Sequence, residues 1–214
     1  MNPQTALSVP IPVGYTEERA ARFDALLAVN YRREGKTFTD SAADHGGATA
    51  YGVSLRFLKA TGSLDVDHDG FADLDLNFDH VIDAQDIRAI AADPKLADAI
   101  YFKHFWIGPG VWQLPKSLDA AVFDQAVNGG CTAAIRLLQQ ALNSFAPPVI
   151  AQDGVLGTKQ TLPRLADCLK AEKPVLAAYR QAAADRYRKI VAADPTQAKW
   201  LNGWLNRASE LGRV

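Results

Sequence analysis

The chain contains 214 residues, of which 48% are hydrophobic, so it is long enough to bury a core without disulfide bonds. Its 23 basic and 24 acidic residues give a formal net charge of −1, which excludes a general attraction to nucleic acid or to an anionic membrane surface. No stretch is long and apolar enough to span a bilayer, and the N-terminal residues lack the pattern of a signal peptide. We therefore expect no nucleic-acid partner and no stable membrane insertion. We also predict a monomer.

The first predicted helix carries the first candidate functional residue. Residues 1–15, which include three prolines, are expected to form an extended arm. Thr16 is a suitable N-cap for a helix that runs to about Glu34. Leu27 and Tyr31 recur at helical spacing and Glu34 follows Tyr31 by three residues, so the Glu34 carboxylate belongs to the stripe that the helix buries.

The rest of the chain is predicted to be helical, after a polar segment in which Gly46 and Gly47 mark a turn between short extended pieces. Helices are expected over 54–62, from 84 onwards, and over 94–106, 117–127, 132–145, 159–171, 174–192 and 195–211. The sequence has no βαβ alternation and no repeat of solenoid length, so the predicted fold class is mainly α with a small β element. Two cysteines are too few for a disulfide framework, and we expect free thiols.

Two carboxylates are suited to glycoside hydrolysis, which needs a protonated acid for the leaving oxygen and a second carboxylate. Glu34 lies among apolar residues at a helix C-terminus, where desolvation and the helix dipole both disfavour the anion. Asp44 lies in an open turn beside two glycines, where solvent keeps it ionised, and Asp40 is an alternative for this role. Thr49 follows on the same segment and is expected to orient the attacking water. A glutamate at a helix end is often only solvated, so the neighbouring motifs decide.

Those motifs have a recognisable pattern. Glu34-Gly35, followed by the run DHGGATAYGV at 44–53, resembles the active-site signature of the glycoside hydrolase family 108 muramidases, many of which phages and prophages encode. Later segments are similar to that family in the same order, so the resemblance covers nearly the whole chain from about residue 20. These are Ile100-Tyr101, Phe105-Trp106, FDQAVNG at 123–129, LQQAL at 138–142, Asp153-Gly154 with Gly157, and GWLNR at 203–207.

The resemblance implies a lysozyme-like helical fold and an activity. The expected reaction is cleavage of the β-1,4 bond between N-acetylmuramic acid and N-acetylglucosamine in peptidoglycan, with Glu34 as the catalytic acid. Tyr51, Asp124 and Asn128 are candidate substrate-binding residues, although the last two, four residues apart on one helix, could equally brace helices. We divide the chain into the arm, a catalytic part at 16–145 with an insertion at 63–90, and a C-terminal part at 146–214 that resembles a peptidoglycan-binding lobe packed with the catalytic part.

Acidic residues gather in the insertion, in a pattern typical of an EF-hand loop, which presents oxygen ligands at positions 1, 3, 5, 7, 9 and 12. One register fills all six positions with Asp75, Asn77, Asp79, the Val81 carbonyl, Asp83 and Asp86. An earlier register begins with Asp65, Asp67 and Asp69 but has Leu76 at its twelfth position. Because such carboxylates repel one another without a cation, we predict one structural Ca²⁺ ion, or two, rather than a merely solvated loop.

The leading functional hypothesis is an endolysin-like lysozyme that causes host cell lysis. It would be synthesised in the host cytoplasm and released to the cell wall in the periplasm through a pore made by another protein. The alternative is a non-catalytic module that binds peptidoglycan or responds to calcium in secretion. A zinc amidase or peptidase is disfavoured, because the four histidines show no HExxH spacing.

Overall fold

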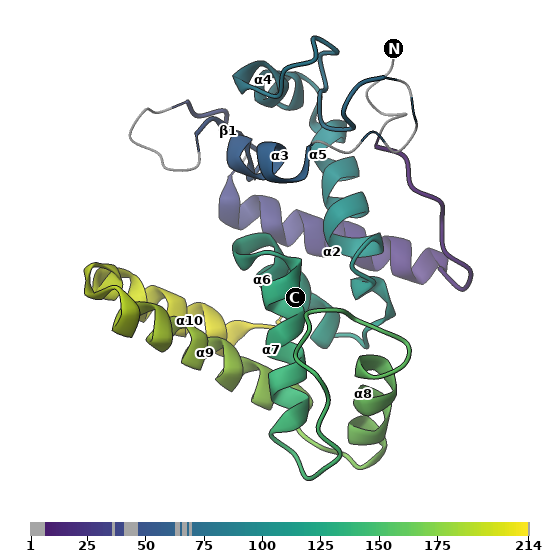
Figure 1. Ribbon diagram of the computed structural model, residues 1–214, viewed down its shortest axis with the longest axis vertical. Coiled ribbons are helices and arrows are strands. Elements are labelled where there is room, and N and C mark those ends of the chain that lie inside the picture. Colours follow the sequence, from purple (N-terminus) through teal and green to yellow (C-terminus); the bar gives the residue numbers. More distant parts are fainter. Residues whose placement is uncertain are drawn as a thin grey trace. The chain divides into compact units, whose positions relative to one another are not determined.

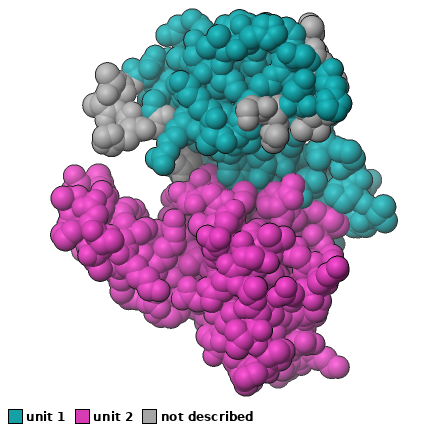
Figure 2. Space-filling view, in the orientation of Figure 1, with its two compact units in different colours: residues 1–107 teal, residues 108–214 magenta. Residues whose placement is uncertain are grey.

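The computed structural model describes residues 7–35, 37–40, 47–62, 65, 68 and 70–213, except for the side chain of Glu34. Helices dominate the described chain, and a two-stranded sheet accompanies them, which confirms the predicted mainly α class with a small β element (Figure 1). The chain forms two compact units, residues 1–107 and 108–214 (Figure 2). None of the described helices is long and apolar enough to cross a membrane. Cys131 and Cys168 are free thiols, as predicted.

Unit 1 begins with its longest helix and continues with shorter elements. In chain order these are α2 (Glu17–Glu34), β1 (Thr49–Ala50), β2 (Val53–Ser54), α3 (Leu55–Thr61), α4 (Ala84–Ala92), α5 (Pro94–Tyr101) and the π-helix η1 (Phe102–Ile107). The predicted cap of α2 is confirmed, since the Thr16 hydroxyl accepts from the Arg19 amide at 3.4 Å. Ser54 caps α3 in the same way by accepting from the Phe57 amide at 3.2 Å. Both helix starts therefore follow from local side-chain chemistry.

The helix predicted over residues 94–106 is wrong in one respect, because it changes from an α-helix to a π-helix after Tyr101. The consecutive residues Phe105, Trp106 and Ile107 are all buried. An α-helix separates neighbouring side chains by about 100°, and the wider π turn is a local departure from that spacing. Trp106 anchors this segment: its ring packs against Phe23 with centroids 5.9 Å apart, and its indole N–H donates to the Tyr15 hydroxyl at 3.0 Å.

Unit 2 is helical throughout its regular elements. In chain order these are the 3₁₀-helix η2 (Val111–Gln113), α6 (Leu118–Gly129), α7 (Cys131–Asn143), α8 (Thr161–Lys170), α9 (Val175–Ala193), the 3₁₀-helix η3 (Pro195–Trp200) and α10 (Leu201–Glu210). The helix predicted over 195–211 therefore starts as a 3₁₀ turn, where Asp194 caps the Thr196 amide. Helix α7 packs against α6 and α9, and α10 packs against α9. The hydroxyl of the fully buried Tyr179 on α9 donates to the Ala134 carbonyl of α7 at 3.2 Å.

A buried glutamine fixes the turn between α7 and α8. Gln139 accepts from the Gly154 amide at 2.9 Å and donates to the carboxylate of Asp153 at 2.6 Å. Gly154 has a φ of 80°, and a Cβ there would lie 2.5 Å from the methyl carbon of Thr132. The two family-like segments LQQAL and Asp153-Gly154 thus have a structural role, because one supplies the side chain that orders the other.

Candidate active site

The predicted acid stands at the end of a helix. Glu34 is the last residue of α2, and Gly35 ends the helix with a φ of 81° while its amide donates to the Tyr31 carbonyl at 3.1 Å. The side chain of Glu34 lies outside the described residues, and so do Asp44 and the other residues of 41–46. In the sequence of α2, Glu34 follows Asn30 by four residues and Tyr31 by three, so these three residues lie on one side of the helix.

A group of tyrosines lies on that face. The Tyr31 hydroxyl donates to the Asp98 carboxylate of α5 at 2.5 Å, and its ring meets Tyr51 and Tyr101 edge-on, with centroids 5.5 and 6.0 Å away. Burial, together with the hydrogen bond to Asp98, raises the pKa of Tyr31 above its usual value, so the hydroxyl remains a donor. This tyrosine therefore links α2, α5 and the turn of the sheet.

The small sheet comes from the segment that carries the second half of the family-like signature. Strands β1 and β2 pair antiparallel, with Thr49 opposite Ser54 and an additional bridge from Thr49 to Thr39. Tyr51 occupies the turn with a φ of 51°, and its carbonyl accepts from the Tyr101 hydroxyl at 3.0 Å. The Thr49 hydroxyl donates to the Gly47 carbonyl at 3.4 Å. Thr49 and Tyr51 are thus held on a hairpin whose turn contacts the face of α2 that ends in Glu34.

Asp98 and Asn30 are polar residues of this region that the sequence analysis missed. Asp98 is 67 residues from its partner Tyr31, and its only sequence signal is a spacing of three before Tyr101, which puts both on one face of α5. Asn30 is 6% exposed, and its Nδ2 group has no acceptor among the residues that the structure describes. A buried amide is ordinarily hydrogen-bonded, so this donor marks the Glu34 face of α2 as a place where a polar partner fits.

The acidic loop of unit 1 closes on itself through backbone amides. Asp75, 2% exposed, accepts from the amides of Asp79 and His80 at 3.2 and 2.7 Å. Asp86, fully buried, accepts from the amides of Leu76 and Asp83 at 2.7 and 2.8 Å. Burial raises the pKa of the Asp86 carboxyl, and the amide hydrogen bonds oppose that shift. These two carboxylates thus hold the beginning and the end of the loop together.

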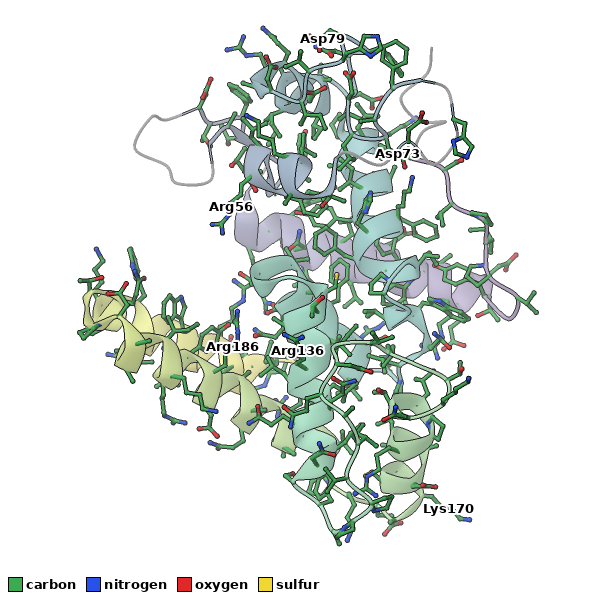
Figure 3. The ribbon with its side chains drawn as sticks, viewed as in Figure 1. Arg56, Asp73, Asp79, Arg136, Lys170 and Arg186 are labelled. Atoms are coloured by element: carbon green, nitrogen blue, oxygen red, sulfur yellow. The ribbon has the colours of Figure 1, made fainter. Side chains whose placement is uncertain are left out.

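The other predicted calcium ligands have mixed surroundings. Asp83 caps α4 by accepting from the Gln85 amide at 2.6 Å, whereas the side-chain amide of Asn77 donates to the carboxylate of Asp79 at 2.9 Å. The Asp79 side chain, labelled in Figure 3, is exposed. In the earlier register Asp65 accepts from the Gly70 amide at 3.2 Å, and Asp67 and Asp69 lie outside the described residues. Within the described part of the chain, no three histidine, cysteine or acidic side chains form a group that could hold a metal ion.

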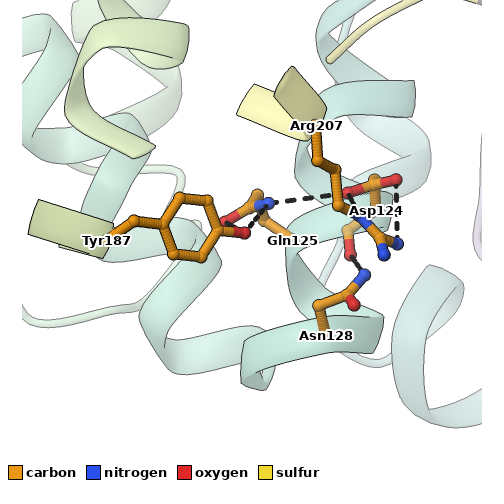
Figure 4. Close-up of polar contacts among 5 residues, drawn as sticks. All are labelled: Asp124, Gln125, Asn128, Tyr187 and Arg207. Carbon is orange, nitrogen blue, oxygen red and sulfur yellow. Dashed lines mark hydrogen bonds and ion pairs between the residues drawn. The ribbon is translucent and has the colours of Figure 1, made fainter. Parts of the chain in front are cut away.

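The remaining candidates, Asp124 and Asn128, lie on α6 in unit 2, whereas Tyr51 belongs to unit 1. Both Asp124 oxygens accept from Arg207 of α10, at 3.0 Å from Nε and 3.2 Å from Nη2 (Figure 4). The Asn128 amide donates to the Asp124 carbonyl at 2.8 Å, and the neighbouring Gln125 donates to the Tyr187 hydroxyl of α9 at 3.0 Å. The Asp124 side chain is only 9% exposed. This cluster joins α6 to the two last long helices of unit 2.

Comparison with known proteins assigns the two parts of the chain. Residues 27–130 match the sequence profile of the family described as Glycosyl hydrolase 108. Residues 27–130 belong to this family. Residues 133–209 match a second profile, described as Predicted Peptidoglycan domain. This family 108 chain is therefore a glycoside hydrolase that acts on peptidoglycan, as its motifs predicted. No curated protein matches the chain.

The family 108 chain shares its fold with a solved structure, described as "Structure of Brucella abortus SagA". The TM-score is 0.60 at 22% sequence identity, and the match covers 91% of this chain and 98% of that one. The family 108 profile ends at Gly130, where α6 meets α7, whereas the compact units divide after Ile107. The family match therefore includes α6 with Asp124 and Asn128, although these residues fold within unit 2.

Proposed function

We propose that the chain is a muramidase, which hydrolyses the β-1,4 bond between N-acetylmuramic acid and N-acetylglucosamine with Glu34 as general acid. The observation that carries the proposal is the family 108 match over residues 27–130, because this range includes the Glu34-Gly35 motif. Glu34 is the acidic residue of that motif. Glu34 ends α2 three residues after the half-buried Tyr31, at the negative end of the helix dipole. Both an apolar setting and that dipole favour a protonated carboxyl group, as a general acid requires.

The roles of the other residues follow from the reaction. Asp44 is the proposed second carboxylate, which stabilises positive charge at the anomeric carbon or activates water, and Thr49 is proposed to orient that water. Tyr51, whose ring contacts Tyr31, is proposed to line the sugar site. Asp98 does not replace Asp44 in this scheme, since its carboxylate accepts from Tyr31 and fixes the face of α2 that carries Glu34.

The bond specificity is tested by product analysis. The full-length protein is incubated with purified peptidoglycan, and the released ends are reduced with borohydride and identified by mass spectrometry. A muramidase gives reduced muramic acid ends, whereas a glucosaminidase gives reduced glucosamine ends and an amidase frees amines without new reducing ends. Binding to peptidoglycan without any new ends would support the non-catalytic alternative and overturn the proposal.

Replacing Tyr31 with phenylalanine should lower the turnover of peptidoglycan by about tenfold to a hundredfold, because small misplacements of a catalytic group have effects of this size. The substitution removes the hydroxyl that bonds Asp98 and keeps the ring contacts with Tyr51 and Tyr101. The measurement is the initial rate of reducing-end release, together with the melting temperature. Tyr187→Phe is a matched control in unit 2, where the lost hydroxyl bonds Gln125. Equal rates for native protein and Tyr31→Phe would exclude a positioning role for this pair.

We propose further that the enzyme acts as an endolysin, synthesised in the cytoplasm as a monomer and delivered to the wall through a pore made by another protein. The support is the resemblance of its motifs to those of phage-encoded family members. Expression in a bacterial cytoplasm should cause lysis only when a pore-forming phage holin is co-expressed. Rapid lysis without the holin would contradict this route.

Calcium binding by residues 75–86 is a separate proposal, supported by the order of oxygen donors along the loop. The oxygen ligands suit a hard cation in type and spacing. Several of them also accept hydrogen bonds from backbone amides. Saturating Ca²⁺ should raise the free energy of unfolding by about 2.7 kcal/mol at a hundred times the dissociation constant. The measurement is thermal unfolding in Ca²⁺, Mg²⁺ and a chelator, with Asp79→Ala as the variant that loses the effect. Identical unfolding in all three would leave the carboxylates as amide acceptors only.

A further inference from the structure

A groove on unit 2 lies apart from every residue assigned so far. It has a volume of about 450 Å³. It is lined by residues 115–118, before and at the start of α6, and by residues from the end of α8 to the first turns of α9. Apolar side chains form much of its surface, among them the buried Leu118, the half-buried Leu176 and Leu169, which is 43% exposed. A cavity whose wall is largely apolar is typical of a site that receives a ligand.

The charged side chains that line the groove are all positive. They are Lys116, Lys173 and Arg180, and no carboxylate of a residue that the structure describes lines the cavity. None of these three cations forms an ion pair with a residue that the structure describes. Basic side chains gathered in one apolar cavity repel one another, so the arrangement favours an anion between them.

The surroundings of the groove also favour an anion. Arg180 donates from Nε and Nη2 to the Leu211 carbonyl at 2.8 and 2.7 Å, which fixes its guanidinium group. Gly212 packs next to this contact, since a Cβ there would lie 2.7 Å from the Ser117 carbonyl. Helix α9 begins at Val175 with no side-chain cap, and its first residues line the cavity, so the positive end of its dipole lies beside the groove.

We propose that this groove binds the acidic peptide stem of peptidoglycan, a short peptide with free carboxylates and alanine methyl groups. The inference rests on the proposed function in one respect, that peptidoglycan is the substrate. It identifies the part of that polymer that unit 2 binds. The carboxylates match the three cations, and the methyl groups match the leucine surface. The glycan strand offers no such anions, because the muramic acid carboxyl group is amide-linked to the peptide. A phosphate-rich wall polymer would match the cations but not the apolar surface.

The test uses the full-length native protein and the N-acetylated stem tetrapeptide L-Ala–γ-D-Glu–meso-diaminopimelate–D-Ala, with binding measured by NMR titration. The peptide contains no glycosidic bond, so its binding is independent of whether the protein cleaves glycans. We expect the free peptide to bind and the same peptide with amidated carboxyl groups to lose binding. Lys116→Glu combined with Lys173→Glu should weaken binding by about tenfold or more, because both substitutions oppose the ligand's charge.

A matched control keeps the charge change constant. Lys170→Glu with Lys189→Glu alters two exposed lysines of unit 2 that do not line the groove, of which Lys170 is drawn in Figure 3. This double variant should bind the peptide like the native protein, and both double variants should keep the native melting temperature. The proposal is overturned if the native protein does not bind the peptide, if the groove variant binds as well as the control, or if glycerol phosphate polymer competes more strongly than the peptide.

Discussion

Replacing Glu34 with glutamine is expected to lower the release of reducing ends from peptidoglycan by at least about a hundredfold, the lower end of what a general acid contributes. Glutamine keeps the size and the hydrogen-bonding ability of the side chain but cannot give a proton to the leaving oxygen. Because Glu34 ends α2 and Gly35 supplies the helix terminus with its positive φ, the substitution leaves the helix intact. The melting temperature should therefore stay within the error of the native value.

The control for this experiment is Glu17→Gln, which makes the same chemical change at the first residue of the same helix. Glu17 is exposed and stands a whole helix length from the proposed site, so this variant should retain full activity. Asp44→Asn provides the second comparison, since loss of the other proposed carboxylate should also lower the rate. An enzyme that hydrolyses peptidoglycan normally with Glu34→Gln would show that the acid is another residue, and Asp98 would be the first to examine.

Local chemistry explains which parts of the fold the sequence could predict. Thr16 and Ser54 bond amides only three residues away, so their helix starts can be read directly. The hydrogen bond from Tyr31 to Asp98 spans 67 residues and the contact from Arg207 to Asp124 spans 83, and neither has a local signature. The change to a π-helix after Tyr101 accompanies the burial of three consecutive residues, Phe105, Trp106 and Ile107, which a helical periodicity of apolar residues does not specify.

The candidate site shows the same division. The sequence predicted the helix end at Glu34 and a small β element after it, with a turn at Gly46-Gly47. It did not predict the hairpin turn at Tyr51 between the strands that pair Thr49 with Ser54. The sequence also did not predict the hydrogen bonds that order this site. Tyr31 donates to the Asp98 carboxylate, and Tyr101 donates to the Tyr51 carbonyl. Polar residues that position a site come from distant elements, so their pairing becomes visible only when the fold brings α2, α5 and the hairpin together.

Replacing Arg207 with methionine should lower the free energy of unfolding by about 3 kcal/mol, the cost of leaving one member of a largely buried ion pair without its partner. Asp124 is 9% exposed, and both of its oxygens accept charged hydrogen bonds from Arg207. Methionine preserves the length and the apolar stem of the side chain, so lost packing contributes little. Urea unfolding followed by circular dichroism measures the change.

The same experiment separates the two roles open to Asp124. Arg188→Met breaks an ion pair with Asp185 in which both side chains are exposed, 53% and 39%, and should cost less than about 1 kcal/mol. If Asp124 is a brace, Asp124→Asn combined with Arg207→Met should be more stable than the sum of the single changes predicts, because each single change leaves a charge that the double variant removes. If Asp124 contacts the sugar, Asp124→Asn should instead weaken binding to peptidoglycan at temperatures where the protein is fully folded. Additive losses of stability together with weakened binding would assign Asp124 to the substrate.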